Sequence, residues 1–376
     1  NTKIDYSLHL RPFGDEKLEV IWQSKFGFGN AVYQGANRYY LNNFYMSQHK
    51  LEFKGKNFFV RGYTTAEDGG ESYDMLFTGL NINRKWKDDT TWFGQYAGTF
   101  VQATLAGQTP ENAHIISRGV ADKGRFLPGT PEFQGAFNQV IADPDVLTGS
   151  KLVDNSRVNH SDANYNFRDI IKYGEIQVGG SYRQYQLNSH GRIYTDDNGP
   201  INYNEYGVYA QLQKKYLQDR LKFTGSVRYD KSKNFDGSFS PRVSLVYSGG
   251  EKKQHNFRGS YQTGFRNPST QDQYIGFNVG SAVLIGSAPD NLTRYTETRD
   301  VANGSPAIGQ VYAGGTSVVM TGVNAYQNSY TKASVDQFAA FARANPGNTP
   351  GAAALLRVTD VNNVKPEEVQ AFELGY

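Results

Sequence analysis

Apolar and polar side chains alternate along several stretches of the chain. In residues 220–231 the odd positions are mostly apolar and the even positions are polar: Leu221, Phe223, Val227 and Tyr229 against Lys222, Thr224, Ser226 and Arg228. A period of two places alternate side chains on opposite faces of a β-strand. Residues 4–10, 18–26, 176–182, 206–212 and 255–265 repeat this period. The sequence therefore predicts about a dozen strands of ~9–12 residues, longer than the ~5–6 residues of globular strands.

The connections between these segments alternate in length. Short polar turns are predicted at 11–16, 54–56, 217–219 and 248–251, and long links at roughly 29–43, 101–156, 188–203 and 266–367. An antiparallel sheet with short turns at one end and long loops at the other is typical of transmembrane β-barrels. In such barrels the short turns are periplasmic and the long loops are extracellular.

Helical signals occur only inside two of the long links. Thr130 followed by Pro131 and Glu132 reads as an N-cap, a proline at the first helical position and a first-turn acid. Thr109 and Pro110 begin a second such motif, residues 335–342 share an apolar face that stops before Asn345, and Thr349 begins a short turn. We expect short helices that decorate the loops rather than a separate helical domain.

Composition narrows the classes of protein. The 26 Tyr, 23 Phe and 3 Trp stand beside 40 Gly and no Cys, and the net charge is +3. The missing cysteine excludes disulfide scaffolds, zinc ribbons and thiol catalysis, and the balanced charge argues against nucleic-acid binding. A mean hydropathy of −0.61, without an apolar run of ~18 residues, excludes a transmembrane helix.

Two all-β architectures fit this composition. A soluble β-sandwich also alternates apolar and polar positions. The strand length favours a membrane barrel, because ~9–11 residues cross a bilayer at a tilt. Aromatic residues near predicted strand ends, such as Tyr216, Tyr229, Tyr247 and Phe265, resemble the interfacial girdles of such barrels.

No arrangement of residues indicates catalysis or a bound cofactor. The six histidines are scattered without zinc-binding spacing, and neither a phosphate-binding loop nor a nucleophile elbow occurs. Residues 196–199 (Asp-Asp-Asn-Gly) resemble part of a calcium loop but lack its downstream Glu, and a hairpin-tip turn explains them as well. We therefore predict no enzyme activity, no metal site and no cofactor.

The candidate functional residues lie on the polar side of the predicted strands. Arg228, Arg242, Arg258, Gln262 and Arg266 are predicted to line a barrel lumen or to bind a ligand there. Arginine suits the recognition of acidic ligand groups. The alternative is that these side chains pair with neighbouring Asp and Glu, or with a domain inside the barrel.

Several strand motifs resemble one family. Residues 239–247 read Phe-Ser-Pro-Arg-Val-Ser-Leu-Val-Tyr, and 258–269 read Arg-Gly-Ser-Tyr-Gln-Thr-Gly-Phe-Arg-Asn-Pro-Ser. The end of the chain reads Lys-Pro-Glu-Glu and then Phe-Glu-Leu-Gly-Tyr. Together with 206–211 and 227–230, these motifs resemble the barrel of TonB-dependent outer-membrane receptors. The resemblance is specific over about 174–270 and 364–376, and the loop at 128–133 looks like forms from Bacteroidota.

The resemblance implies that residues 1–376 are one part of a 22-stranded barrel, with loop insertions at about 101–156 and 266–367. The plug domain, through which the inner-membrane protein TonB acts, and the final strands are expected outside the chain. Phe372, Leu374 and Tyr376 also alternate as a terminal barrel strand would, but the Pro-Glu and Glu-Leu-Gly-Tyr match is normally internal.

The family's function implies an outer-membrane receptor in contact with membrane lipid. Such a receptor captures a scarce, bulky solute and imports it by energy-coupled, gated passage. The substrate is a small molecule, glycan or peptide, with siderophore and cobalamin among the possibilities. A passive channel or structural barrel is the alternative function, and a secreted glycan-binding β-sandwich is a more distant one.

Overall fold

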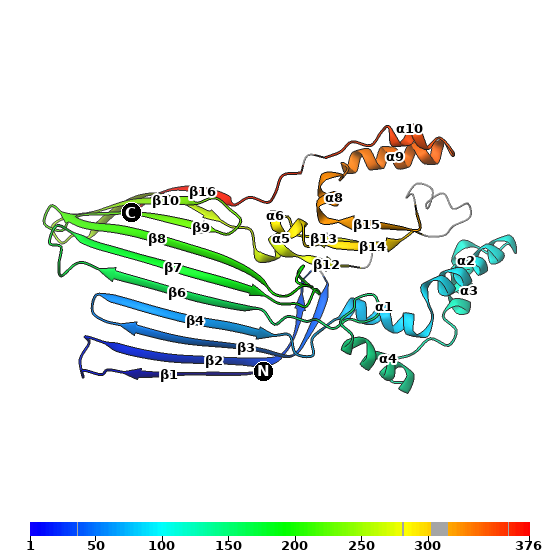
Figure 1. The fold of residues 1–376 in the computed structure, drawn as a ribbon, viewed down its shortest axis with the longest axis horizontal. Helices are drawn as coiled ribbons and strands as arrows, with labels where there is room; N and C mark the ends of the chain where they lie inside the picture. Colours follow the sequence, from blue (N-terminus) through cyan, green and yellow to red (C-terminus); the bar gives the residue numbers. More distant parts are fainter. Residues whose placement is uncertain (36, 280–281, 302–314, 360) are drawn as a thin grey trace.

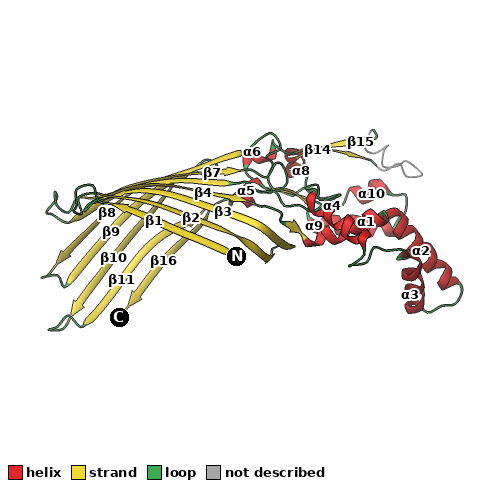
Figure 2. Cartoon of the chain, turned by 90° about the horizontal axis from the view of Figure 1, so that it is seen from below, coloured by secondary structure: helices red, strands yellow, loops and turns green. Residues whose placement is uncertain are grey.

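One large antiparallel sheet forms most of the protein (Figure 1). The computed structural model describes residues 1–35, 37–279, 282–301, 315–359 and 361–376. The sheet has 12 strands in the order β1-β2-β3-β4-β6-β7-β8-β9-β10-β11-β16, and the short β5 pairs with β3. Figure 2 shows that the sheet curves and stays open between β1 and β16.

The predicted segments of alternating side chains correspond to β1, β2, β7, β8, β9 and β11 of the sheet. The strands are β1 (Thr2–Leu10), β2 (Glu19–Gln34), β3 (Arg38–Lys54), β4 (Phe58–Asp68), β5 (Tyr73–Asp74), β6 (Arg157–Asn166), β7 (Glu175–Leu187), β8 (Ile201–Tyr216), β9 (Leu221–Ser232), β10 (Ser238–Gly249), β11 (His255–Arg266) and β16 (Glu367–Gly375). The predicted strands are thereby confirmed. No helix in the described ranges is long and apolar enough to cross a membrane.

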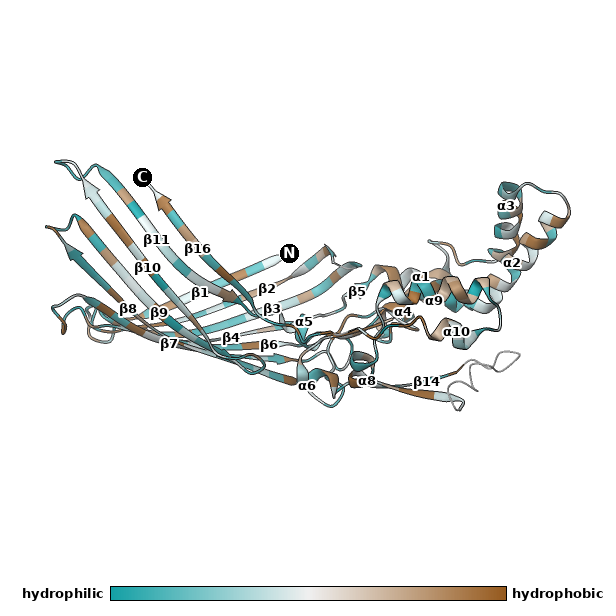
Figure 3. Ribbon diagram, turned by 90° about the horizontal axis from the view of Figure 1, so that it is seen from above, coloured by the Kyte–Doolittle hydropathy of each residue, from teal (hydrophilic) through white to brown (hydrophobic). Residues whose placement is uncertain are grey.

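The register of the sheet separates two faces. Arg242 of β10 pairs with Ser226 of β9 and Gln262 of β11, and paired residues point to the same side. The neighbouring Val243 pairs with Gly225 and Tyr261 on the opposite face. Every antiparallel pair from β1 to β16 continues this phase, so charged side chains gather on one face. Figure 3 shows the resulting alternation of hydrophilic and hydrophobic positions along the strands.

The connections divide between the two ends of the sheet (Figure 1). Short turns at 11–18, 55–57, 167–174, 217–220 and 250–254 join strands at one end. The long connections at the other end are 69–156, apart from β5 (Tyr73–Asp74), together with 188–200 and 267–366. The predicted asymmetry of short turns and long links is therefore confirmed.

The predicted link at 29–43 is wrong. Strand β2 runs through 29–34 and strand β3 through 38–43. The register shifts between Gly29 and Ala31 at a β-bulge. A bulge adds one unpaired residue, so it changes the phase of the alternation and hides the strand from a search for a period of two.

The first long connection begins earlier than the predicted residue 101. It carries α1 (Met75–Trp86), α2 (Asp89–Leu105), α3 (Pro110–Ala121) and α4 (Pro131–Ala142). The predicted starts of α3 and α4 are confirmed: Thr109 and Thr130 cap these helices, each accepting a hydrogen bond from a backbone amide. Ile82 of α1 packs against Ala136 and Val140 of α4.

The last long connection contains several short elements. These are α5 (Thr270–Tyr274), β12 (Gly276–Asn278), β13 (Val283–Ile285), α6 (Pro289–Leu292), β14 (Thr296–Asp300), β15 (Ser317–Thr321), α8 (Gly322–Gln327), α9 (Lys332–Ala344) and α10 (Thr349–Ala353). The predicted helix over 335–342 lies within α9, which ends at Asn345, and α10 begins at the predicted Thr349.

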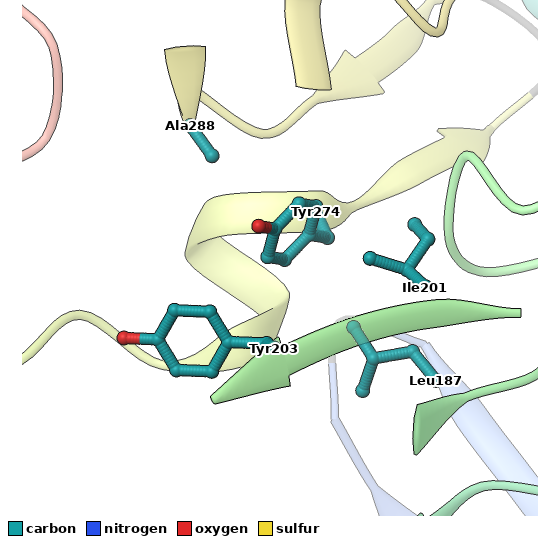
Figure 4. Packing of buried hydrophobic residues seen from close by; sticks show 5 residues of the cluster. All are labelled: Leu187, Ile201, Tyr203, Tyr274 and Ala288. Atoms are coloured by element: carbon teal, nitrogen blue, oxygen red, sulfur yellow. The ribbon is translucent and has the colours of Figure 1, made fainter. Parts of the chain in front are cut away.

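A buried cluster anchors the start of this connection to the sheet. Leu187 at the end of β7 and Ile201 at the start of β8 pack with Tyr203, Tyr274 and Ala288 (Figure 4). Leu187 and Ile201 belong to the polar face by register. Because the polar face becomes apolar at this rim, residues 270–279 and 282–292 fold over it, and Tyr274 is completely buried.

The separation into faces predicts opposite effects of arginine at adjacent positions of β10. We expect Val243→Arg to prevent membrane insertion, because a charge on the lipid side near the bilayer midplane costs about 2–4 kcal/mol. Ser244→Arg, on the polar face, is the matched control and should insert normally. Heat-modifiable migration of outer-membrane fractions on SDS gels measures the inserted fraction. Equal insertion of the two variants would contradict the assignment of faces.

Asn291 is expected to hold the anchored connection in place. Its amide donates to the carbonyl oxygens of Ile275 at 3.2 Å and Gly286 at 2.8 Å, and its side-chain oxygen accepts from the Thr195 hydroxyl. Asn291→Leu keeps the size but leaves buried polar groups unpaired, at ~1–3 kcal/mol each. Proteolysis within 267–292 should become about tenfold faster or more, whereas the exposed Asn112→Leu should leave the rate unchanged. Unaltered proteolysis of Asn291→Leu would show that the connection is held by other contacts.

Candidate functional site

The polar face carries ion pairs that join neighbouring strands. Arg61 of β4 makes two bonds with Asp162 of β6, at 2.7 Å from Nε and 3.0 Å from Nη2. Arg183 of β7 lies 3.7 Å from Glu205 of β8. Pairs in a partly hydrated cavity neutralise charge without the full desolvation penalty of a protein core. The face is therefore polar, although ion pairs between neighbouring strands neutralise much of its charge.

The structure places all five predicted residues on this face, but it does not join them into one site. Arg228 is engaged by Asp230, with Nη2 to Oδ1 at 2.6 Å, and by the Ser181 hydroxyl at 3.2 Å. Arg266 makes two bonds to Glu367, at 2.8 and 3.0 Å. Arg228 and Arg266 therefore pair with neighbouring acidic side chains, which was the alternative interpretation of the predicted residues.

The other three predicted residues are less constrained. Arg242 and Gln262 are direct cross-strand neighbours. Arg258 lies opposite Gly375, whose missing side chain leaves room for the guanidinium. Within the described ranges neither Arg242 nor Arg258 forms an ion pair with an acidic side chain. These two arginines are therefore cations available on the polar wall.

A polar pocket of about 440 Å³ lies where the polar face meets the long connections. Arg183, Tyr185, Tyr203, Glu205, Asp230, Asn267 and Thr270 are among its lining residues. The Asn267 amide donates to Glu205 at 3.1 Å, which ties the last connection to the sheet. Arg183 also donates to the Tyr185 hydroxyl at 3.2 Å. The polar pocket is therefore lined by both positively and negatively charged side chains.

A second cavity, the aromatic cleft, lies among the long connections and the β2–β3 hairpin. It has a volume of about 410 Å³ and is lined by Tyr33, Gly35, Tyr39, Leu41, Phe44, Gly69, Ser72, Leu152, Asp154, Ile193, Tyr194, Gln271, Ile275, Phe277 and Leu284. A smaller cavity of about 220 Å³, the joining cavity, lies between the two sites. It shares Tyr185 and Thr270 with the polar pocket and Tyr194 with the aromatic cleft. The rim of the sheet thus carries a series of adjoining cavities.

Burial changes the acidity of two groups in the aromatic cleft. It raises the pKa of the Asp154 carboxyl above its usual range, and the negative charge of Asp196 adds to this effect. Burial raises the pKa of the Tyr194 hydroxyl to about 12, and the nearby Asp154 charge contributes. Both shifts have the direction expected when low-polarity surroundings disfavour an anion.

The described residues hold no group of three or more acidic or histidine side chains placed to bind a metal ion. The Asp196 carboxylate instead accepts hydrogen bonds from the amides of His190 and Gly191 at 3.0 and 2.8 Å, and from the Ser189 hydroxyl at 2.7 Å. Asp196 therefore stabilises the connection between β7 and β8 from within. This agrees with the interpretation of residues 196–199 as a turn.

Sequence reasoning missed most residues of the polar pocket and the aromatic cleft. Arg183 and Glu205 follow the same period of two as the predicted arginines and could have been found from it. Asp154 and Tyr194 come from two connections and Tyr33 from the end of β2, and their association depends on tertiary contacts. No pattern within any one segment indicates that they meet.

A curved antiparallel sheet with one polar and one apolar face, short turns at one end and long connections at the other defines part of a transmembrane β-barrel. The family model described as "TonB dependent receptor-like, beta-barrel" matches residues 18–376, so the chain belongs to that family. The family's members are outer-membrane proteins of Gram-negative bacteria. The predicted family, fold and location are thereby confirmed.

The chain is similar to several solved structures at low sequence identity. The siderophore receptor PirA from Pseudomonas aeruginosa is 10% identical, with a TM-score of 0.41 over 82% of this chain and 38% of that chain. The ferric enterobactin receptor PfeA mutant from the same species is 10% identical, with a TM-score of 0.42 over 80% and 35%. The FrpB iron transporter from Neisseria meningitidis is 13% identical, with a TM-score of 0.38 over 71% and 37%.

The chain spans 38% or less of the length of each of these three structures. No curated protein matches the chain.

The raised pKa of Asp154 predicts a pH-dependent effect of Asp154→Asn. A raised folded-state pKa means that stability is full below the unfolded pKa and is lost as the pH rises through the folded value. At about pH 7.5 the variant should resist local opening better than the parent, and at about pH 3 the difference should vanish. Hydrogen exchange of the amides in 150–156 measures this opening.

The exposed Asp336→Asn is the matched control, because its carboxylate pairs with Lys332 on the surface of α9. It should show no gain at neutral pH. If the amides of the parent protein exchange no faster than those of Asp154→Asn at neutral pH, burial of the Asp154 carboxylate does not destabilise this region, which would contradict the prediction.

Proposed function

We propose that the protein acts as an energy-coupled outer-membrane receptor that captures a scarce, bulky solute at its outer rim and imports it through the barrel. The observation that carries this proposal is the series of adjoining cavities where the polar face meets the long connections. Membership in the TonB-dependent receptor family supplies the mode of transport. Binding followed by gated passage requires no chemical step, so the proposal includes no catalysis.

In this proposal the long connections are extracellular and the polar face is the wall of the solute path. Arg228, Arg242, Arg258, Gln262 and Arg266 line that path, and the cations at Arg242 and Arg258 contact passing solute or the plug domain. TonB acts through that plug domain, drawing on the inner-membrane proton gradient. Siderophore, cobalamin, glycan and peptide are all substrates that such a rim can accept.

The anchored connection favours a gated receptor over a passive channel. Residues 270–279 and 282–292 fold over the rim of the polar face, with Tyr274, Gln273 and Asn291 fully buried. A channel that conducts freely requires an unobstructed mouth. A mouth partly covered by a packed connection suits capture of one solute and its controlled release inward.

The test is uptake by cells that express the full-length receptor. Deletion of its gene should abolish depletion of a specific component of the medium, followed by mass spectrometry, and complementation should restore it. Deletion of tonB, or collapse of the proton gradient with a protonophore, should abolish uptake equally while surface binding persists. Uptake that continues without TonB would contradict energy coupling and establish the passive channel instead.

A further inference from the structure

The aromatic cleft has the size and accessibility of a ligand site. Its volume of about 410 Å³ falls within the ~300–1,000 Å³ of small-molecule sites. Tyr33 and Leu284 at its margin are 56% and 44% exposed, so a solute can reach the interior. Because the cleft lies among the long connections, it faces the side from which a solute arrives under the proposed function.

The walls of the cleft are mainly aromatic and aliphatic. The rings of Tyr33 and Tyr39 are stacked with centroids 6.0 Å apart on either side of Gly35. Tyr194, Phe277 and Ile275 supply further apolar surface. Flat rings prefer offset-stacked or edge-on partners at centroid distances of ~4.5–7 Å, so such walls select an aromatic group.

The charge of the cleft restricts which aromatic group fits. Asp154 is the one acidic side chain in the lining, and the lining has no Lys, Arg or His among the residues that the structure describes. The Asp154 Oδ1 atom accepts from the Ser156 amide at 3.0 Å. The Ser156 side chain also hydrogen-bonds this carboxylate. An ionised carboxylate offers about four acceptor sites, so Asp154 keeps capacity to accept from a ligand.

The walls are held in place before any ligand binds. The Gly69 amide donates to the Asp154 carbonyl oxygen at 2.9 Å, which fixes the acidic wall. The Gly276 amide donates to the Ile193 carbonyl oxygen at 2.9 Å, and Tyr194 forms a β-bridge with Ile275. A preformed cleft lowers the entropic cost of binding.

We propose that the aromatic cleft binds an aromatic group bearing a cationic or neutral hydrogen-bond donor, which Asp154 accepts, and disfavours anionic aromatic groups. This inference rests on the proposed function, since it names the part of the solute that is recognised first. The polar remainder of a bulky solute extends through the joining cavity, past Tyr194 and Thr270, into the polar pocket.

Three probes of nearly equal size test the proposal: 2-phenylethylamine, 2-phenylethanol and phenylacetate. Saturation-transfer NMR with the full-length receptor in lipid nanodiscs measures the binding of each. We expect the amine to bind most tightly, the alcohol less tightly and the carboxylate least. Phenylacetate binding as tightly as the amine would overturn the proposal.

Two variants assign the selectivity to this cleft. Asp154→Asn keeps the side-chain shape and should reduce the preference for the amine over the alcohol about tenfold, the contribution of a charged hydrogen bond. Leu284→Lys places a cation at the exposed margin and should shift the preference towards phenylacetate. The surface variant Asp336→Asn should bind the probes as the parent does. An unchanged preference in both cleft variants would place the probes elsewhere.

Failure of this inference is distinguishable from failure of the proposed function. If uptake depends on TonB but the probes bind without regard to charge, only the ligand class is wrong. If the probes show the expected order but uptake persists without TonB, the cleft is a binding site on a protein that is not energy-coupled.

Discussion

The structure depends on one constraint: every strand must present one face to lipid and the other to water while all its backbone groups stay paired. An antiparallel ladder satisfies the backbone, and its register decides which side chains share a face. A slip of one residue in any pair would exchange the two faces. From β1 to β16 the phase is kept, so Arg61, Arg183 and Arg228 share one face although they stand on separate strands.

The candidate site lies where the polar face of the sheet becomes apolar. Where β7 ends and β8 begins, the polar face carries Leu187, Ile201 and Tyr203 instead of charged residues. These residues cannot contact lipid, so they are buried by α5 and Ala288 from the last connection. Docking that connection brings Asn267 against Glu205 and Tyr194 beside Ile275. The polar pocket and the aromatic cleft are consequences of the same docking.

Local signals made much of the fold predictable. Alternation identified strands such as β8, β9 and β11, and the N-caps Thr109 and Thr130 identified two helices. Both signals are properties of a few neighbouring residues. Helix α1 was missed because its position depends on distant contacts, such as the Asn81 amide donating to the Val146 and Gly149 carbonyl oxygens. Asp154 and Tyr33 of the aromatic cleft were beyond prediction for the same reason.

Cysteine scanning along β10 in the full-length protein tests the central claim most directly, since this chain contains no native cysteine. Single substitutions at 240–247 are labelled in intact membranes with a water-soluble maleimide. The account predicts labelling at Ser240, Arg242 and Ser244 and protection at Val243, Leu245 and Tyr247, with a period of two. Uniform labelling, or labelling in the opposite phase, would contradict a wall between lipid and a water-filled path.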